Sequence, residues 1–163
     1  PTAREYLEIA HGTFVWRSLP AYEKNANKRI VKHPKGHFRN CGLLHHLWHI
    51  KDQRDLLSHP LMGRSRESMI LENIIHGFQQ TGLIFHPYYY RTCAGAEIDL
   101  IIESSKGILP NEIKFTQKIN RQDLRALKDF ISERNCPIGW VVHNCERVEW
   151  LDDKILAIPA TSL

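Results

Sequence analysis

Residues 95–114 of this 163-residue chain read GAEIDLIIESSKGILPNEIK and predict a β-hairpin whose loop lies near residues 104–107. Apolar and polar residues alternate along both arms, which is typical of strands with one buried face. The expected apolar rows are Ile98, Leu100 and Ile102 on the first strand and Leu109, Ile113 and Phe115 on the second. The reverse faces carry Glu97, Asp99 and Glu103 on the first strand and Glu112 and Lys114 on the second.

The length of the loop decides which residues face each other across the hairpin. If Lys106-Gly107 is a two-residue turn, Asp99 lies across from Lys114, and if the loop is 104–107, Asp99 lies across from Glu112. Both even-length loops bring the three charged groups to one face, whereas a three-residue loop would split them. Two carboxylates and an ammonium on one face suit a hard divalent cation and an activated water. The alternative interpretation is an ordinary solvated face, because an acid-x-Lys pair is by itself a weak signal.

A third acid is expected from the helix predicted at residues 64–82, RSRESMILENIIHGFQQTG. Its apolar stripe follows the i, i+3, i+4, i+7 pattern and consists of Leu71, Ile74, Ile75 and Phe78. At about 100° per residue, Glu67 lies near the centre of this stripe and Glu72 is displaced from it by about 100°. A carboxylate in line with a buried stripe needs a positive partner. Glu67 is therefore the expected helix acid above the sheet, with Glu72 as the runner-up.

The remaining segments predict an α/β fold. Upstream we expect a helix at 2–11, strands at 13–19 and 29–32, a boundary at Pro34-Lys35-Gly36, a short helix at 42–50 and a turn at 51–55. Downstream we expect a strand at 83–91, the hairpin, a helix at 120–134, a strand at 138–143 and a closing hairpin at 148–158. From the Glu67 helix onward the order is α-β-β-β-α-β, which predicts a mixed sheet flanked by helices.

These blocks resemble a known superfamily. A helix acid, the Gly-x-Glu-x-Asp of residues 95–99 and the Glu-x-Lys of residues 112–114 resemble the PD-(D/E)XK nucleases. The runs HFRNCGLLHHLWHI, GRSRESMILENII, YYYRTCAGAEIDLIIE and ILPNEIK resemble one member family, a domain of unknown function at the C-terminus of bacterial and archaeal AAA-type ATPases. Residues 1–38 resemble the end of the winged-helix region that precedes that domain. The resemblance implies a restriction-endonuclease-like core over residues 41–163, with a small winged-helix remnant and basic linker over residues 1–40.

The resemblance also implies roles for individual residues. Matched by position, the catalytic residues are Glu67, Asp99, Glu112 and Lys114, with Mg²⁺ (or Mn²⁺ as a substitute) held by Asp99, Glu112 and Glu67. One departure from the family pattern is Asn111, which precedes Glu112 where an apolar residue is usual. The implied activity is metal-dependent hydrolysis of a phosphodiester. The alternatives are a catalytically inactive DNA-binding or assembly module on the same fold, and an RNA- or protein-binding adaptor.

Positive charge is concentrated in one segment. Residues 24–51 hold seven of the 22 basic residues and no acid, whereas the remaining 15 basic residues are set against 18 acidic ones. Such a segment can follow a phosphate backbone, and the expected nucleic-acid contacts are Lys28, Arg29, Lys32 and Lys35, with Arg91 just before the Asp99 strand. DNA is the favoured partner. A solvated linker, or a surface that docks on an acidic ATPase module, explains the segment about equally well.

Composition and motifs restrict the cellular compartment that we expect for the protein. No apolar run approaches the roughly 20 residues that span a bilayer, and no stretch of these residues has the pattern of a signal peptide, so we expect none. The four cysteines are scattered without a CxxC pair, which favours a reducing compartment. No GxxxxGK[ST] loop occurs, and the chain starts at Pro1. We therefore expect a soluble, cytoplasmic fragment, with any ATPase module lying upstream.

Overall fold

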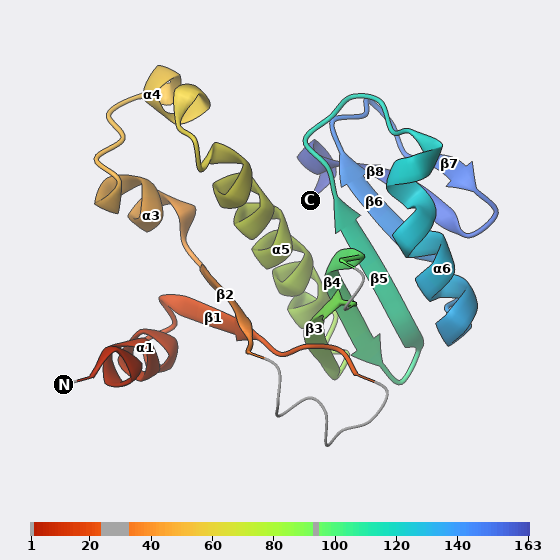
Figure 1. The fold of residues 1–163 in the computed structure, drawn as a ribbon, viewed down its shortest axis with the longest axis horizontal. Coiled ribbons are helices and arrows are strands. Elements are labelled where there is room, and N and C mark those ends of the chain that lie inside the picture. Colours follow the sequence, from red (N-terminus) through yellow and green to blue (C-terminus); the bar gives the residue numbers. More distant parts are fainter. Residues whose placement is uncertain (1, 24–32, 93–94) are drawn as a thin grey trace.

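Six strands form a mixed sheet at the centre of the protein (Figure 1). The computed structural model describes residues 2–23, 33–92 and 95–163. The strands are β3 (Phe85–Arg91), β4 (Glu97–Ser104), β5 (Gly107–Ile113), β6 (Gly139–His143), β7 (Glu149–Asp152) and β8 (Ile155–Pro159). Their order in the sheet is β3-β4-β5-β6-β8-β7, with β5-β6 and β6-β8 parallel and the other neighbours antiparallel.

One long helix covers each face of this sheet. Helix α5 (Met62–Gln80) packs its Ile70, Leu71, Ile74 and Ile75 against one face. Helix α6 (Arg125–Arg134), which follows a 3-10 helix at Arg121–Leu124, packs Leu127, Phe130 and Ile131 against the other. A last 3-10 helix spans Ala160–Ser162. The predicted α/β class and the order α5-β3-β4-β5-α6-β6 are confirmed, as is the closing hairpin β7-β8.

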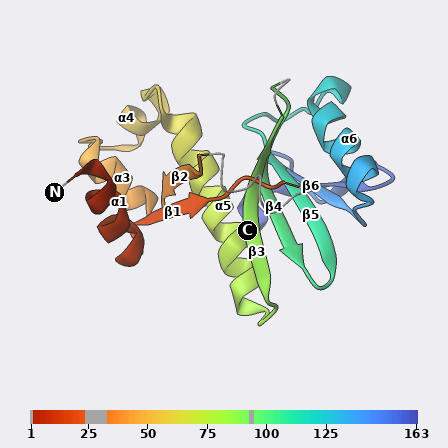
Figure 2. The ribbon, with the colours of Figure 1, turned by 60° about the horizontal axis from the view of Figure 1, so that its bottom comes forward.

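The N-terminal elements lie on the side of α5 that faces away from the sheet, as Figures 1 and 2 show. They are α1 (Ala3–Gly12), β1 (Trp16–Leu19), β2 (Lys35–Phe38), α3 (Cys41–Leu47) and α4 (Gln53–Ser58). Strands β1 and β2 form a separate antiparallel pair. After β1 the chain runs along the edge strand β3, where Tyr22 N–H donates to the Tyr89 carbonyl at 2.6 Å and Tyr89 N–H donates to that of Pro20 at 3.0 Å. The N-terminal region is thus bonded directly to the central sheet.

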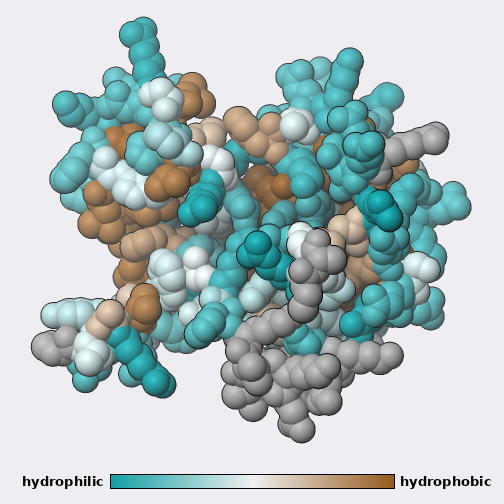
Figure 3. Space-filling view, viewed as in Figure 1, coloured by the Kyte–Doolittle hydropathy of each residue, from teal (hydrophilic) through white to brown (hydrophobic). Residues whose placement is uncertain are grey.

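Two expectations for this region differ from the structure. The expected turn at 51–55 is wrong, because Asp52 accepts hydrogen bonds from the N–H groups of Arg54 and Asp55 and so caps helix α4. The break expected at Pro34-Lys35-Gly36 contains the start of β2, where Gly36 lies under the Trp16 ring. The strand expected at 29–32 lies outside the described residues. Apolar residues also remain on the surface over α3 and α4 (Figure 3), among them Leu47 and Leu57.

The hairpin adopts one of the two expected registers. Ser104 pairs with Gly107 and Leu100 pairs with Asn111, so the turn is Ser105-Lys106 and the same register, continued by one residue, sets Asp99 opposite Glu112. Asn111, the departure from the family pattern, is fully buried, and its amide donates to the Leu100 carbonyl at 3.3 Å and to that of Leu109 at 2.9 Å. The polar side chain is therefore accommodated inside the sheet.

A β-bulge interrupts the alternation of β4 beside Asp99. Tyr88 pairs with Ile101 but Tyr90 pairs with Ile98, so the β3 register shifts by one residue between them. As a result Ile98 belongs to the core under α6, whereas Leu100 and Ile102 belong to the core under α5. The expected single apolar row is therefore wrong at Ile98. A bulge of this kind re-aims the side chains next to it, here that of Asp99.

Candidate functional site

Asp99 lies where β4 and β5 stop pairing. The last ladder pair is Leu100 with Asn111, and beyond it the Asp99 Oδ2 accepts a hydrogen bond from the Ile113 N–H at 2.8 Å. The carboxylate thus takes the place of a backbone acceptor at the end of the ladder. Its other oxygen, Oδ1, is left to face the neighbouring charged groups.

Glu112 and Lys114 stand at the end of β5, next to Asp99. The Lys114 ammonium lies 2.6 Å from Glu112 Oε1, and the Lys114 N–H is bound to the Val142 carbonyl of β6 at 2.9 Å. Glu112 is only 7% exposed, and among the described residues its Oε2 has no hydrogen-bond partner. A buried carboxylate oxygen without a donor is costly, and it indicates an acceptor position that a further ligand could use.

A second lysine enters the cluster from β2. The Lys35 Nζ lies 2.7 Å from Glu67 Oε1, 3.1 Å from Glu97 Oε1 and 3.8 Å from Asp99 Oδ1. Glu67 comes from α5, and the other two acids come from the start of β4. The expectation that a positive group pairs with Glu67 is confirmed, and that group is Lys35.

The electrostatics reflect the crowding of these acids. Burial and the neighbouring Glu67 carboxylate raise the pKa of Asp99 to about 6, against the Ile113 hydrogen bond and the two lysines. Burial and the Asp99 carboxylate raise the pKa of Glu112 to about 7, although Lys114 lowers it. Burial alone would lower the pKa of Lys35, but the bonds and charges of Glu67, Asp99 and Glu97 together outweigh burial and raise that pKa above its ordinary value. Both lysines are therefore held as cations.

The cluster carries more negative than positive charge. Its four carboxylates are Glu67, Glu97, Asp99 and Glu112, and its two ammonium groups are Lys35 and Lys114. Arg91 stands at the margin, with its Nε 3.9 Å from Glu97 Oε2 and its side chain 64% exposed. Across residues 2–23, 33–92 and 95–163, however, no group of three His, Cys, Asp or Glu side chains has a spacing that could hold a metal ion. Carboxylate oxygens are the ligand type that a hard cation prefers, but in this structure the carboxylates are spaced around the two lysine ammonium groups.

Comparison with known proteins identifies the family. Residues 62–163 match the family described as Domain of unknown function (DUF4143). The chain belongs to the DUF4143 family. This domain of unknown function is found in AAA-ATPase-associated proteins. Residues 1–54 match a second family, Domain of unknown function (DUF8612).

Two curated proteins similar to this DUF4143 protein carry the description "Uncharacterized protein". One protein of Mycobacterium tuberculosis and one of Mycobacterium bovis are each 34% identical over 164 residues, which is 99% of this chain and 35% of theirs. The chain thus spans about a third of the length of these relatives. No solved structure matches it. In the described part of the chain, no helix is both long and apolar enough to cross a membrane.

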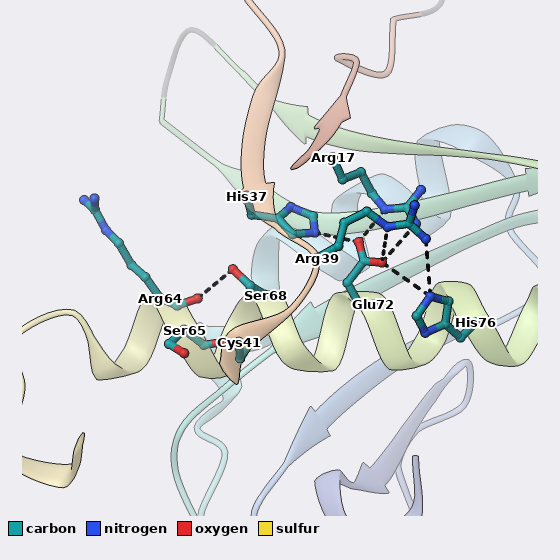
Figure 4. Close-up of polar contacts among 9 residues, drawn as sticks. All are labelled: Arg17, His37, Arg39, Cys41, Arg64, Ser65, Ser68, Glu72 and His76. Atoms are coloured by element: carbon teal, nitrogen blue, oxygen red, sulfur yellow. Dashed lines mark hydrogen bonds and ion pairs between the residues drawn. The ribbon is translucent and has the colours of Figure 1, made fainter. Parts of the chain in front are cut away.

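A second cluster of ionic contacts connects the residues of the DUF8612 match to helix α5 of the DUF4143 domain. Figure 4 shows Arg17, His37 and Arg39 converging on Glu72 of α5. Arg17 makes two bonds to the carboxylate, one of them from Nη2 to Oε2 at 2.9 Å, while His37 Nε2 and Arg39 Nε lie at 2.9 and 3.1 Å. His76 approaches to 3.6 Å. Burial opposes ionisation, but these hydrogen bonds and charges lower the pKa of Glu72 to about 2.

The predicted site residues therefore separate into two groups. Glu67, Asp99, Glu112 and Lys114 are brought together, whereas the runner-up Glu72 lies in the other cluster. Lys35, expected on a nucleic-acid surface, is bound among the acids. The other three expected contacts in the basic segment, Lys28, Arg29 and Lys32, lie outside the described residues.

Two features of the sites went unpredicted. Glu97 was placed on the polar face of its strand but not in the site, and the partners of Glu72 were not foreseen. The available signal was the alternation of Lys35, His37 and Arg39, which puts three basic side chains on one face of a strand.

Proposed function

We propose that this DUF4143 domain is a nuclease-like module of the PD-(D/E)XK type that hydrolyses phosphodiester bonds of nucleic acid with Mg²⁺. The observation that carries the proposal is the buried, unpartnered Glu112 Oε2 in a cluster where four carboxylates outnumber two ammonium groups. The residue types also fit, because carboxylate oxygens are the ligands that Mg²⁺ prefers. The order of elements from α5 to β6 matches the core of that superfamily.

In this proposal Asp99, Glu112 and Glu67 would hold the cation, with Mn²⁺ as a substitute. A bound divalent cation lowers the pKa of a coordinated water and neutralises charge on the phosphate. Lys114, kept charged by Glu112 at 2.6 Å, would orient the attacking water and stabilise the developing negative charge on the phosphate oxygens. The exposed guanidinium of Arg91 would hold a neighbouring phosphate of the same strand.

Partners and location form part of the same proposal. Nucleic acid, with DNA favoured, is the substrate, and an ATPase module elsewhere in the full-length protein is the functional partner. A cytoplasmic setting agrees with Cys41, Cys136 and Cys145, which are free thiols in the structure.

A metal titration tests the proposal. Calorimetry with Mn²⁺ should show binding to the unmodified chain and none to Asp99→Asn or Glu112→Ala, while circular dichroism shows that both variants remain folded. Asp153→Asn is the matched control, because Asp153 is an exposed acid at the β7-β8 turn, outside the cluster. Binding that is the same in all four proteins would overturn the assignment of the site. Cleavage of duplex and single-stranded DNA and of RNA with Mg²⁺ then identifies the substrate.

A second candidate function is a catalytically inactive module that binds DNA or supports assembly. The observation that favours it is the position of Lys35, whose ammonium group lies 2.7 Å from Glu67 and 3.8 Å from Asp99. This function predicts no metal binding. It also predicts that DNA affinity falls with added salt and with neutralisation of Lys28, Arg29 and Lys32. Insensitivity of DNA affinity to salt would point to a protein partner instead.

A further inference from the structure

Lys35 reaches the acid cluster from outside the β4-β5 hairpin. It stands at the start of β2, where it pairs with Leu19 of β1, yet its ammonium lies among carboxylates from α5 and β4. The distances to Glu67 and Glu97, 2.7 and 3.1 Å, are those of charge-assisted hydrogen bonds. The antiparallel pair β1-β2, here called the N-terminal β-ribbon, thus supplies a positively charged side chain to the site of the following domain.

The Lys35 ammonium lies close to carboxylate oxygens that a bound metal ion would need. Glu67 and Asp99 are two of the three proposed metal ligands, and both lie within 3.8 Å of the Lys35 Nζ. The ammonium donates a hydrogen bond to Glu67 Oε1 and lies 3.8 Å from Asp99 Oδ1, so it takes a Glu67 lone pair and the space that a cation bound by both acids would need. The third ligand, Glu112, keeps a buried oxygen without a donor among the described residues. Lys35 therefore fills part of the cluster and leaves part of it unsatisfied.

We propose that Lys35 is a tethered competitor for the divalent cation, so that metal binds only when the Lys35 ammonium leaves Glu67 and Asp99. This inference rests on the proposed function, since it names a control on the same site. The lysine side chain is 32% exposed, and rotation about its four-carbon stem can carry the ammonium into solvent without unfolding β2. Metal affinity is then set by the position of the N-terminal β-ribbon as well as by the ligands themselves.

The test compares Mn²⁺ affinity in four proteins by calorimetry at low ionic strength. Lys35→Met keeps the aliphatic stem and removes the charge, and it should bind Mn²⁺ about tenfold more tightly than the unmodified chain. Lys35→Arg keeps the charge and should bind no more tightly than the unmodified chain. Lys106→Met is the matched control, because it removes an exposed lysine at the far end of the same hairpin, and it should leave affinity unchanged.

The outcomes separate this inference from the proposed function. Equal Mn²⁺ affinity in the unmodified chain and Lys35→Met would overturn the role of Lys35 and leave the metal site standing. Absence of binding in every protein would remove the metal site, and the competition with it. A second measurement needs no substitution: the side-chain ¹⁵Nζ and ¹³Cε resonances of Lys35 should shift as Mg²⁺ is added, while those of Lys106 stay in place. A Lys35 signal that does not move at saturating Mg²⁺ would overturn the inference even if Lys35→Met fails to fold.

Discussion

Substitution of Glu72 by Gln tests whether the cluster between the N-terminal elements and α5 stabilises the fold. The Glu72 side chain is 4% exposed and bonds to Arg17, His37 and Arg39. Its pKa falls from 4.5 to about 2, because the burial that would raise it is outweighed by the hydrogen bonds from His37, Arg17 and Arg39 together with the charge of Arg17. A difference of that size corresponds to about 3 kcal/mol of unfolding free energy at neutral pH. Loss of one partner from a buried ion pair costs a similar amount, about 3–5 kcal/mol.

The dependence on pH gives the sign of the effect. The folded-state pKa of Glu72 lies below that of the unfolded chain, so the ionised carboxylate stabilises the fold above about pH 5. That contribution disappears as the pH falls toward 2. The difference in unfolding free energy between the unmodified protein and Glu72→Gln should therefore be about 3 kcal/mol at pH 7, and it should shrink steadily in acid.

The assay is urea unfolding followed by tryptophan fluorescence, repeated at several pH values between 7 and 3. Glu8→Gln is the matched control, because it makes the same chemical change at the Arg4–Glu8 pair, whose side chains are 87% and 66% exposed. An exposed pair of this kind contributes about 0.5 kcal/mol or less. Equal losses in the two variants, or a loss in Glu72→Gln that does not change with pH, would refute the reasoning.

Three further outcomes are expected. Mn²⁺ affinity, measured by calorimetric titration, should fall as the pH is lowered from about 7 to about 5. The pKa values of Glu112 and Asp99 are raised to about 7 and about 6, so protons compete with the metal for the ligand oxygens in this range. An affinity that stays constant across this range would contradict the cluster as the binding site. Glu112→Gln should raise the unfolding free energy at pH 8 by on the order of 1 kcal/mol. The reason is that a carboxyl group with a raised pKa destabilises the fold as the pH rises toward its folded-state pKa, here about 7. At pH 5 the gain in unfolding free energy should be smaller. Gly36→Ala should lower the unfolding free energy by about 1–3 kcal/mol in urea titrations, because its Cβ would lie 2.1 Å from the Trp16 ring. Gly63→Ala, whose Cβ would have nothing within 4 Å, should not destabilise the fold.

The central fold was predictable because its elements are long and periodic. The stripe of Leu71, Ile74, Ile75 and Phe78 locates α5 from sequence, and Asn120 marks the start of the segment that ends in α6. These signals depend only on neighbours within a turn or two. They do not require knowledge of which elements pack together.

The bulge in β4 shows where local reasoning ends. Strict alternation put Ile98 in one row with Leu100, but pairing with β3 inserts an extra residue beside Tyr89. The extra residue lies in β4, where Asp99 and Leu100 together lie opposite Tyr89, and the alternation of residues along β4 does not reveal it. The proximity of Asp99 to Glu112 nevertheless agrees with one of the two expected registers, because the turn at Ser105-Lys106 fixes it independently.

The partners of Lys35 and Glu72 could not be predicted from the sequence for a related reason. A basic segment free of acids predicts an exposed patch, since the sequence does not say which acids lie across the fold. Likewise Glu72 is displaced by about 100° from the stripe that faces the sheet, and the sequence gives no sign of what lies against it. It is 3% exposed because β1 and β2 cover that second face of α5. A helix with a buried face on each side carries two patterns that overlap in one sequence.

The two clusters are linked by the geometry of β2 on α5. Residues two apart on a strand are separated by about 6.6 Å on one face, and residues five apart on a helix are separated by about 7.5 Å along its axis. Lys35 and His37 can therefore reach Glu67 and Glu72 at the same time, as the distances of 2.7 and 2.9 Å show. A shift of β2 along α5 would break both contacts together. The buried Glu72 cluster thus holds Lys35 in register with the acid cluster, and loosening it by Glu72→Gln should also weaken the hold of Lys35 on Glu67.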